Sequence, residues 1–154
     1  MRKIVHNKIS YLLINMLIWF AIFSVVPTLF QLLLYFTLPF DYFVKINSYV
    51  ANHSSSQIIT IKLNRIARFD VEATSIKEVY RVDEDGIKQV YEVPKRMFVY
   101  ETDANGQTVT FEQPVPDLPV GNYYISDTIT LELPKGIEKT KTIKSNSFLV
   151  ENNS

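Results

Sequence analysis

Cysteine is absent from all 154 residues of the sequence. Disulfide bonds, thiolate nucleophiles and cysteine metal sites are therefore excluded, so a domain outside a membrane must be stabilised by its packed core alone. Histidine is almost as scarce, since only His6 and His53 occur, and neither has the spacing of a metal site. The four glycines do not form a phosphate-binding loop. We therefore expect no enzyme activity, no cofactor and no bound metal.

Charge of either sign is missing from one long segment. No Asp, Glu, Lys or Arg occurs in residues 9–40. Before this segment stand three basic residues and no acidic one, and after it stand all sixteen acidic residues and thirteen of the sixteen basic ones. The later part is thus slightly acidic, which argues against a nucleic-acid partner, because nucleic-acid binding usually requires a basic face. Nothing in the pattern indicates a small-molecule substrate.

The uncharged segment predicts a transmembrane helix. A span needs about 20 residues, and residues 11–33 alone contain fourteen Leu, Ile, Phe or Val residues. The segment is too long for a typical signal peptide and is followed by no A-x-A-like cleavage site, which favours an uncleaved signal-anchor over residues 9–38. The basic residues in the tail, residues 1–8, predict a cytoplasmic N-terminus by the positive-inside rule.

Polar residues within the predicted span point to a possible helix contact. Ser24, Thr28 and Gln31 fall at i, i+4 and i+7, so they share one helical face and predict packing against another helix, including a second copy. The alternative is that these groups bond to their own backbone carbonyls or reach the lipid headgroups. Pro27 predicts a bend, or a change in the helix beyond it.

From Asp41 onward the pattern changes to alternating apolar and polar residues, which indicates strands. Turn signals at residues 83–86, 103–106 and 134–136, and a polar loop at 52–56, separate them. This pattern predicts an all-β outer domain over residues 41–151, an Ig-like β-sandwich of seven or eight strands, preceded by one transmembrane α-helix. A small β-barrel is the alternative. The predicted strands are 42–50, 57–66, 71–82, 87–93, 97–102, 107–113, 122–133 and 137–150.

Aromatic residues next to the predicted turns are the candidate contact residues of this domain. Tyr80 and Tyr91 flank the 83–86 turn, and Phe98 and Tyr100 precede the 103–106 turn. Exposed aromatic side chains on a rigid sheet are typical anchors of a protein contact. The alternative is that all four rings fill the core.

Four arginines raise the question of a basic patch. Arg65, Arg68, Arg81 and Arg96 lie on or beside predicted strands. They would form a patch if these strands were neighbours. The alternative is that they are ordinary exposed residues paired with the many acidic side chains.

A resemblance rests on four short segments. They are Phe-Val-Lys-Ile-Asn-Ser at residues 43–48, the Asp85-Gly86 turn, Leu-Pro-Val-Gly-Asn-Tyr-Tyr at 118–124, and Ser-Phe-Leu-Val at 147–150. On these residues nearly the whole chain resembles a loosely defined group of small phage-encoded single-span membrane proteins with an Ig-like outer domain. It lacks the group's Lys-Pro-Gly-Asp-like turn, where residues 52–56 stand. The group has no assigned function. The resemblance implies a phage origin and a role at the inner (cytoplasmic) membrane of a bacterial host, with the C-terminal domain periplasmic or extracellular.

Two functions from different classes follow from these features. The first is a membrane-anchored extracytoplasmic protein-binding module, non-enzymatic, in contact with the lipid bilayer and with an envelope protein, a virion protein or a second copy. The second is a lysis-related membrane protein, holin-like or a holin regulator, which oligomerises through its span. The first needs the outer domain, whereas the second needs the polar face of the helix.

Overall fold

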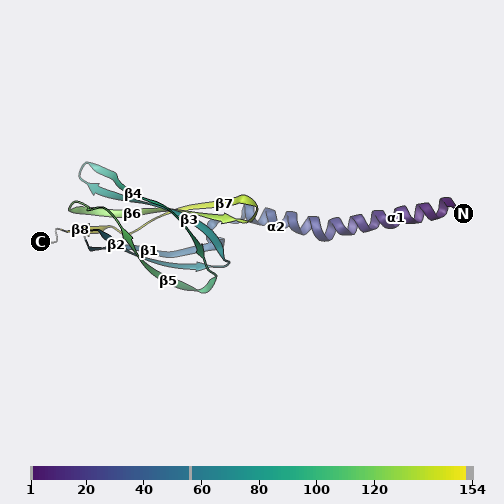
Figure 1. Cartoon of the computed structure of the whole chain (residues 1–154), viewed down its shortest axis with the longest axis horizontal. Coiled ribbons are helices and arrows are strands. Elements are labelled where there is room, and N and C mark those ends of the chain that lie inside the picture. The colour runs from purple at the N-terminus through teal and green to yellow at the C-terminus, as the bar shows by residue number, and fades with distance from the viewer. Residues whose placement is uncertain (1, 56, 152–154) are drawn as a thin grey trace. The chain divides into compact units, whose positions relative to one another are not determined.

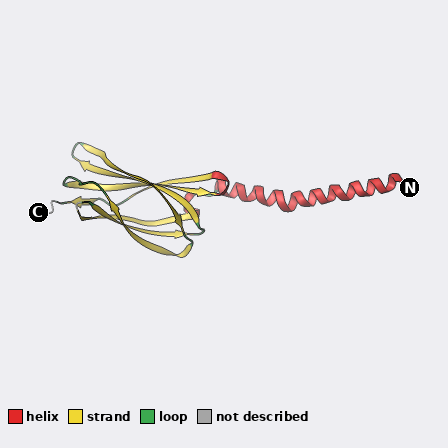
Figure 2. Ribbon diagram, in the orientation of Figure 1, coloured by secondary structure: helices red, strands yellow, loops and turns green. Residues whose placement is uncertain are grey.

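A computed structural model of the chain describes residues 2–55 and 57–151, with side chains from Ser10 onward. The chain divides into two compact units, Met1–Leu38 and Pro39–Ser154. The first unit is helical, and the second is built from strands (Figures 1 and 2). The predicted fold class, one apolar helix before an all-β sandwich, is confirmed.

The first unit is one helix in three pieces. These are α1 (Arg2–Phe20), a π-helical turn η1 (Ala21–Val25) and α2 (Val26–Thr37). The part from Ser10 to Thr37 is 28 residues long, apolar and unburied, so it is long enough to cross a membrane. The helix begins at Arg2, within the predicted tail, whose side chains lie outside the described part. The predicted tail and the apolar segment therefore belong to one continuous helix.

Pro27 accounts for the π-helical turn. Proline has no N–H, and in an α-helix its ring clashes with the carbonyl four residues earlier, here that of Phe23. In the wider turn the N–H of Val26 bonds to the carbonyl of Ala21 instead, and the helix continues beyond it. A single π turn is a common way for a helix to absorb such a disruption. This agrees with the predicted change of the helix at Pro27.

The second unit opens with the one-turn helix α3 (Phe40–Phe43) and continues as eight strands within the described residues. A short 3-10 turn, η2 (Pro134–Gly136), joins the sixth strand to the seventh. The strands are β1 (Val44–Ser55), β2 (Ile58–Ala67), β3 (Val71–Asp83), β4 (Gly86–Tyr100), β5 (Asp103–Pro114), β6 (Gly121–Leu133), β7 (Ile137–Lys144) and β8 (Phe148–Val150).

The strands form two antiparallel sheets. One sheet has the order β1-β2-β5, and the other has the order β4-β3-β6-β7, with β8 pairing the first residues of β6. The chain alternates between the sheets: the β1–β2 hairpin lies in the first, β3–β4 in the second, β5 in the first and the rest in the second (Figure 1). The sheets are stacked as two layers, and the core lies between them (Figure 2).

Alternation along the strands directs apolar side chains into the core. Every second residue of β2 is buried, including Ile59, Ile61 and Leu63, and so is every second residue of β6 from Tyr123 onward. Full burial of a large aliphatic side chain stabilises a fold by about 1.5–3 kcal/mol. The largest fully buried side chains include Tyr123, Ile125, Ile129 and Leu131 of β6.

The predicted loop at residues 52–56 is wrong for its described part. Strand β1 runs on to Ser55, and Asn52 and His53 pair with Thr60 and Ile59 of β2; Ser56 lies outside the described residues. β1 is an edge strand with polar side chains at its end, and backbone pairing with the strongly apolar β2 outweighs their loop-like composition.

Two more predicted boundaries are wrong for backbone reasons. The predicted strands 87–93 and 97–102 are one strand, β4. Pro94 lies at a register shift, between the residues of β4 that pair with Ser75 and Lys77, and an edge strand tolerates proline at such a position. The predicted turn at 103–106 is instead the start of β5: Gly106, with φ of 85°, lies where the pairing with β2 skips residues. This turn signal therefore marks a bulge, which also favours a residue of positive φ.

The predicted last strand is also split. Residues 145–147 separate β7 from β8. Here the side chain of Asn146 leaves the sheet and bonds across the sandwich to β1, accepting from the N–H of Ala51 at 2.8 Å and donating to its carbonyl at 3.0 Å. A side chain that replaces a strand-to-strand backbone pair ends the ladder locally.

Tyr123 fixes the turn before β6. Its ring is fully buried, and its hydroxyl donates to the carbonyl of Pro119 at 2.6 Å. We expect Tyr123→Phe to lower the free energy of unfolding by about 1 kcal/mol, because the Pro119 carbonyl loses a partner while the packing of the ring remains. Thermal unfolding followed by circular dichroism measures this. Tyr91→Phe, on a half-exposed ring without a recorded hydrogen bond, is the matched control, and an equal effect of both changes would contradict the role of Tyr123.

Candidate functional site

The four predicted contact aromatics are not equivalent in the structure. Tyr80 is half-buried on the outer side of its sheet, where it stacks on Tyr124 with ring centroids 5.2 Å apart. Tyr91 is half-buried. Phe98 and Tyr100 point between the sheets, where their rings meet edge to face at 4.9 Å, and Tyr100 is only 2% exposed. The ring of Tyr100 is thus a core group rather than a surface group.

Alternation instead exposes the neighbours of Phe98. Met97 is 72% exposed and Val99 is 53% exposed. Both lie near the end of β4, which pairs with β3 alone and is therefore an edge strand. The segment 97–100 thus combines apolar side chains with an unpaired backbone edge. Sequence reasoning did not fix the phase of this strand, so it did not tell which alternate residues of the segment are exposed.

The polar residues of the predicted helix contact lie in a part of the helix whose residues, from Ser10 to Gln31, are all exposed. Ser24, Thr28 and Gln31 are all exposed. The hydroxyl of Thr28 donates to the carbonyl of Ser24 at 2.6 Å, one turn earlier in the same helix. A hydroxyl satisfied in this way has less need of a partner helix. This geometry favours the backbone-bonding alternative for Thr28.

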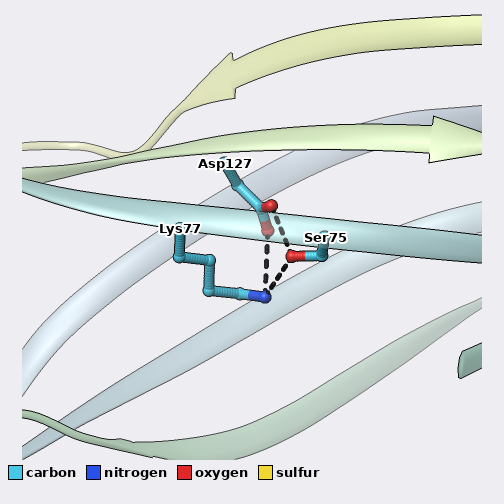
Figure 3. A network of polar contacts seen from close by, with 3 residues as sticks. All are labelled: Ser75, Lys77 and Asp127. Carbon is cyan, nitrogen blue, oxygen red and sulfur yellow. Dashed lines mark hydrogen bonds and ion pairs between the residues drawn. The ribbon is translucent and has the colours of Figure 1, made fainter. Parts of the chain in front are cut away.

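Three polar side chains form a buried network between the sheets (Figure 3). Ser75 and Lys77 lie two residues apart on the inner face of β3, and Asp127 faces them from β6. The Lys77 ammonium lies 3.3 Å from Asp127 Oδ2 and donates to Ser75 Oγ at 2.5 Å. The Ser75 hydroxyl donates to Asp127 Oδ1 at 2.6 Å. The buried cation and the buried anion therefore satisfy each other, with the serine as a bridge.

This network favours a structural role over nucleophilic catalysis. A serine nucleophile needs an adjacent base that takes its proton, and a lysine does so only when it is neutral. Here Asp127 holds Lys77 as a charged donor, and the Ser75 side chain is 2% exposed. The expectation that the chain is not an enzyme stays a prediction.

A cavity of about 410 Å³ borders the network. It lies between the edge strands β4 and β5, and Lys77 and Asp127 are among its lining residues. Arg65 of β2 and Arg96 of β4 bring two further positive charges to its lining. Its apolar and aromatic walls include Leu63, Met97, Phe98, Val99, Val109 and Phe111.

Arg65 is a buried cation in this lining, since it is only 6% exposed. Its guanidinium covers the ring of Tyr100 at 4.6 Å and donates to the carbonyl of Glu101 and to Gln107 Oε1, each at 3.2 Å. In the described part of the chain it has no carboxylate partner. Of the four arginines singled out from the sequence, the structure brings together Arg65 and Arg96, while Arg81 pairs with Asp83 and Arg68 covers Tyr42.

Two buried phenols lie near the same charges. They are Tyr49 and Tyr100, and the hydroxyl of Tyr100 has no hydrogen-bond partner within residues 2–55 and 57–151. Burial, and then the negative charge of Asp127, raise the pKa of both phenols, so both stay protonated at neutral pH. Tyr100 also lines the cavity. Its hydroxyl is thus a buried donor, without a partner in the described part of the chain, on a residue that borders the cavity.

Sequence reasoning missed the network and the cavity. Lys77 and Asp127 stand at inward positions of strands whose other inward residues are apolar, such as Val79 and Ile125. These inward positions could have predicted the network, because a charged side chain in the core requires a partner of opposite charge. Within the described residues, no group of three or more His, Asp or Glu side chains forms a candidate metal site.

Comparisons with known proteins give distant similarities only. No family model matches the chain, and no curated protein matches it in sequence. Among solved structures, the chain is similar to the crystal structure of the C-terminal domain of wzt, with 14% identity over 72% of this chain and 75% of that one and a TM-score of 0.45. It is also similar to Spo0M, a sporulation control protein from Bacillus subtilis, with 11% identity over 70% and 50% of the two chains and a TM-score of 0.35. The resemblance to phage-encoded membrane proteins stays a prediction.

Proposed function

We propose that the chain is a membrane-anchored, non-enzymatic binding module that docks a protein partner along the edge of strand β4. The observation that carries this proposal is the exposed apolar pair Met97 and Val99 on an edge strand. An exposed strand edge accepts a further strand through main-chain hydrogen bonds, and its side chains then give specificity.

The composition of β4 supports a selective contact. Natural edge strands avoid unwanted pairing by carrying lysine, proline and other protective residues. The middle of β4 has such residues in Pro94, Lys95 and Arg96, whereas the segment 97–100 after them has none. The unprotected part of the edge is thus short and apolar, which suits one defined partner rather than general aggregation. Four exposed apolar side chains lie on this strand: Ile87, Val90, Met97 and Val99.

The proposal includes the placement of the chain in a bacterial envelope. The helix would be an uncleaved anchor in the inner membrane, with the N-terminus cytoplasmic and the sandwich periplasmic or extracellular. Supporting this orientation are Arg2, Lys3 and Lys8 ahead of the apolar segment. A phage origin, with an envelope or virion protein as the partner, is the version that the sequence resemblance favours.

Photo-cross-linking of the full-length protein in its native membranes tests the docking edge. A photoreactive amino acid at position 97 should give a discrete cross-linked product with one envelope or virion protein. The double change Met97→Lys, Val99→Lys should lower pull-down of that protein about tenfold or more, because two charges would be buried at the contact. Leu149→Lys is the matched control, since Leu149 is a similarly exposed apolar side chain, at 49%, on β8.

Two outcomes would overturn the proposal. If the double change on β4 and Leu149→Lys on β8 lowered pull-down of the partner equally, the contact would not be specific to β4. Recovery of the chain alone, unaffected by either change and retained after deletion of residues 42–154, would show association through the helix and would favour the lysis-related alternative.

A further inference from the structure

The cavity between β4 and β5 is the strongest feature that the proposed docking edge leaves unexplained. Its volume of about 410 Å³ lies within the roughly 300–1,000 Å³ of small-ligand pockets. Three of its lining side chains are cationic and one is anionic. The anion, Asp127, is neutralised by Lys77 at 3.3 Å. The charge left over in the cavity is therefore positive, from Arg65 and Arg96.

We infer that this cavity binds a small organic anion, a carboxylate attached to an apolar or aromatic body. The inference concerns a ligand in the interior of the sandwich and does not rest on the proposed function of the β4 edge.

The positive end of the cavity fits a carboxylate. A guanidinium presents five donors in a planar fork that matches the two carboxylate oxygens. Arg65 donates two hydrogen bonds, to the backbone carbonyl of Glu101 and to the side chain of Gln107, and it has no carboxylate partner in the described part of the chain. Arg96, from β4, makes no hydrogen bond or ion pair with the side chains that the structure describes, and its own side chain is exposed where it lines the cavity. Both cations are thus available to an incoming anion.

The unpartnered phenol of Tyr100 is a second, independent observation. Its hydroxyl is buried and has no hydrogen-bond partner in the described residues, and Tyr100 is one of the residues that line the cavity. Leaving a buried polar group without a partner is unfavourable, so native structures nearly always satisfy it. The Arg65 guanidinium covers the ring of Tyr100 at 4.6 Å, so a carboxylate that binds Arg65 is the partner that we expect for this hydroxyl.

The remaining walls fit an apolar body rather than a bare inorganic anion. Phe98 and Phe111 enter from the two sheets, together with Leu63 and Val109. Aromatic rings at such a wall pack on the ring of a ligand by stacked or edge-to-face contacts. A cavity of this size filled by water alone would hold about a dozen molecules, most of them against side chains that cannot bond to them.

Methyl NMR of the full-length protein in lipid nanodiscs tests the inference with phenylacetate as the probe. The chain has only three methionines, Met1, Met16 and Met97, so a methionine-methyl spectrum is simple. Met97 is the exposed neighbour of Phe98 at the border of the cavity and reports binding there, and Met16 lies in the apolar helix and reports partition into lipid. Met97→Leu assigns the signal. Phenylacetate should shift the Met97 methyl saturably without moving Met16, and neutral phenylacetamide should bind about tenfold more weakly or worse.

Two conservative variants locate the contact. Arg96→Gln and Tyr100→Phe should each weaken phenylacetate binding about tenfold, because each removes one donor to a charged group. Lys95→Gln and Tyr91→Phe are matched controls that remove the same groups from neighbouring residues outside the cavity lining, and they should bind as the unchanged protein does.

The comparison of acid and amide uses the unchanged protein and does not depend on the folding of any variant. No saturable shift of Met97 up to about 10 mM phenylacetate, well beyond the millimolar range of weak ligands, would mean that water alone fills the cavity. Equal binding of the amide, or binding unaffected by both Arg96→Gln and Tyr100→Phe, would equally overturn the inference.

Discussion

Replacement of Asp127 by alanine should lower the free energy of unfolding of the sandwich by about 3–5 kcal/mol. The change leaves the Lys77 ammonium, whose side chain is 8% exposed, without its counter-charge. Breaking a buried ion pair by removing one partner is costly because the remaining charge stays desolvated. For a domain of this size the thermal midpoint should fall by roughly 10 °C or more.

Circular dichroism of the full-length protein in detergent, at a β-sheet wavelength, measures this loss. Glu132→Ala is the control, since Glu132 is an exposed acid on the same strand, and its effect should stay within about 0.5 kcal/mol. The double change Lys77→Met, Asp127→Leu should recover most of the stability, because an apolar pair of similar volume replaces both charges. If Asp127→Ala cost no more than Glu132→Ala, water would have to solvate Lys77 through the neighbouring cavity.

Single-cysteine labelling should give an all-or-none difference between the two ends of the chain. The protein contains no cysteine, so an introduced thiol is labelled without background. In intact spheroplasts a membrane-impermeant maleimide should label Thr140→Cys, an exposed residue of β7, and should leave Asn7→Cys unlabelled until the membrane is permeabilised. The physical reason is the basic segment ahead of the apolar part of the helix, which the positive-inside rule predicts to stay in the cytoplasm.

The same samples test whether the helix is retained. The membrane fraction should hold a product of 17.9 kDa that resists carbonate extraction. A soluble product shortened by the helix would identify a cleaved signal sequence instead. Labelling of Asn7→Cys in intact spheroplasts would reverse the proposed orientation. Neither result would bear on which protein the sandwich binds.

The parts predicted correctly from the sequence are those with a strong local signal. The apolar segment needs no tertiary information to be recognised as a helix, and the 83–86 turn joins β3 and β4 as its composition indicates. The prediction failed where pairing between strands outweighs local composition. Asn52 and His53 are in a strand because of β2, and Pro94 is tolerated because its strand lies at an edge.

The candidate site was harder to predict for a different reason. Lys77 lies on β3 and Asp127 lies on β6, fifty residues later. The two charged groups come within 3.3 Å of each other only because β3 and β6 pair as neighbours in the sheet. Likewise the cavity joins Arg65 of one sheet to Arg96 of the other. Local alternation tells which residues share a face of a strand, but not which strands face each other across a sandwich.

The way the chain alternates between the sheets also determines when the domain can fold. β5 returns to pair with β2, and β6 then enters the second sheet between β3 and β7, so the first sheet is complete only when Pro114 has been made and the second only when Val150 has been made. Such pairings between distant strands make folding slow, on the order of milliseconds to seconds. During synthesis the earlier hairpins would therefore carry unpaired edges for a time, and a chain truncated before β6 should be prone to aggregation or proteolysis.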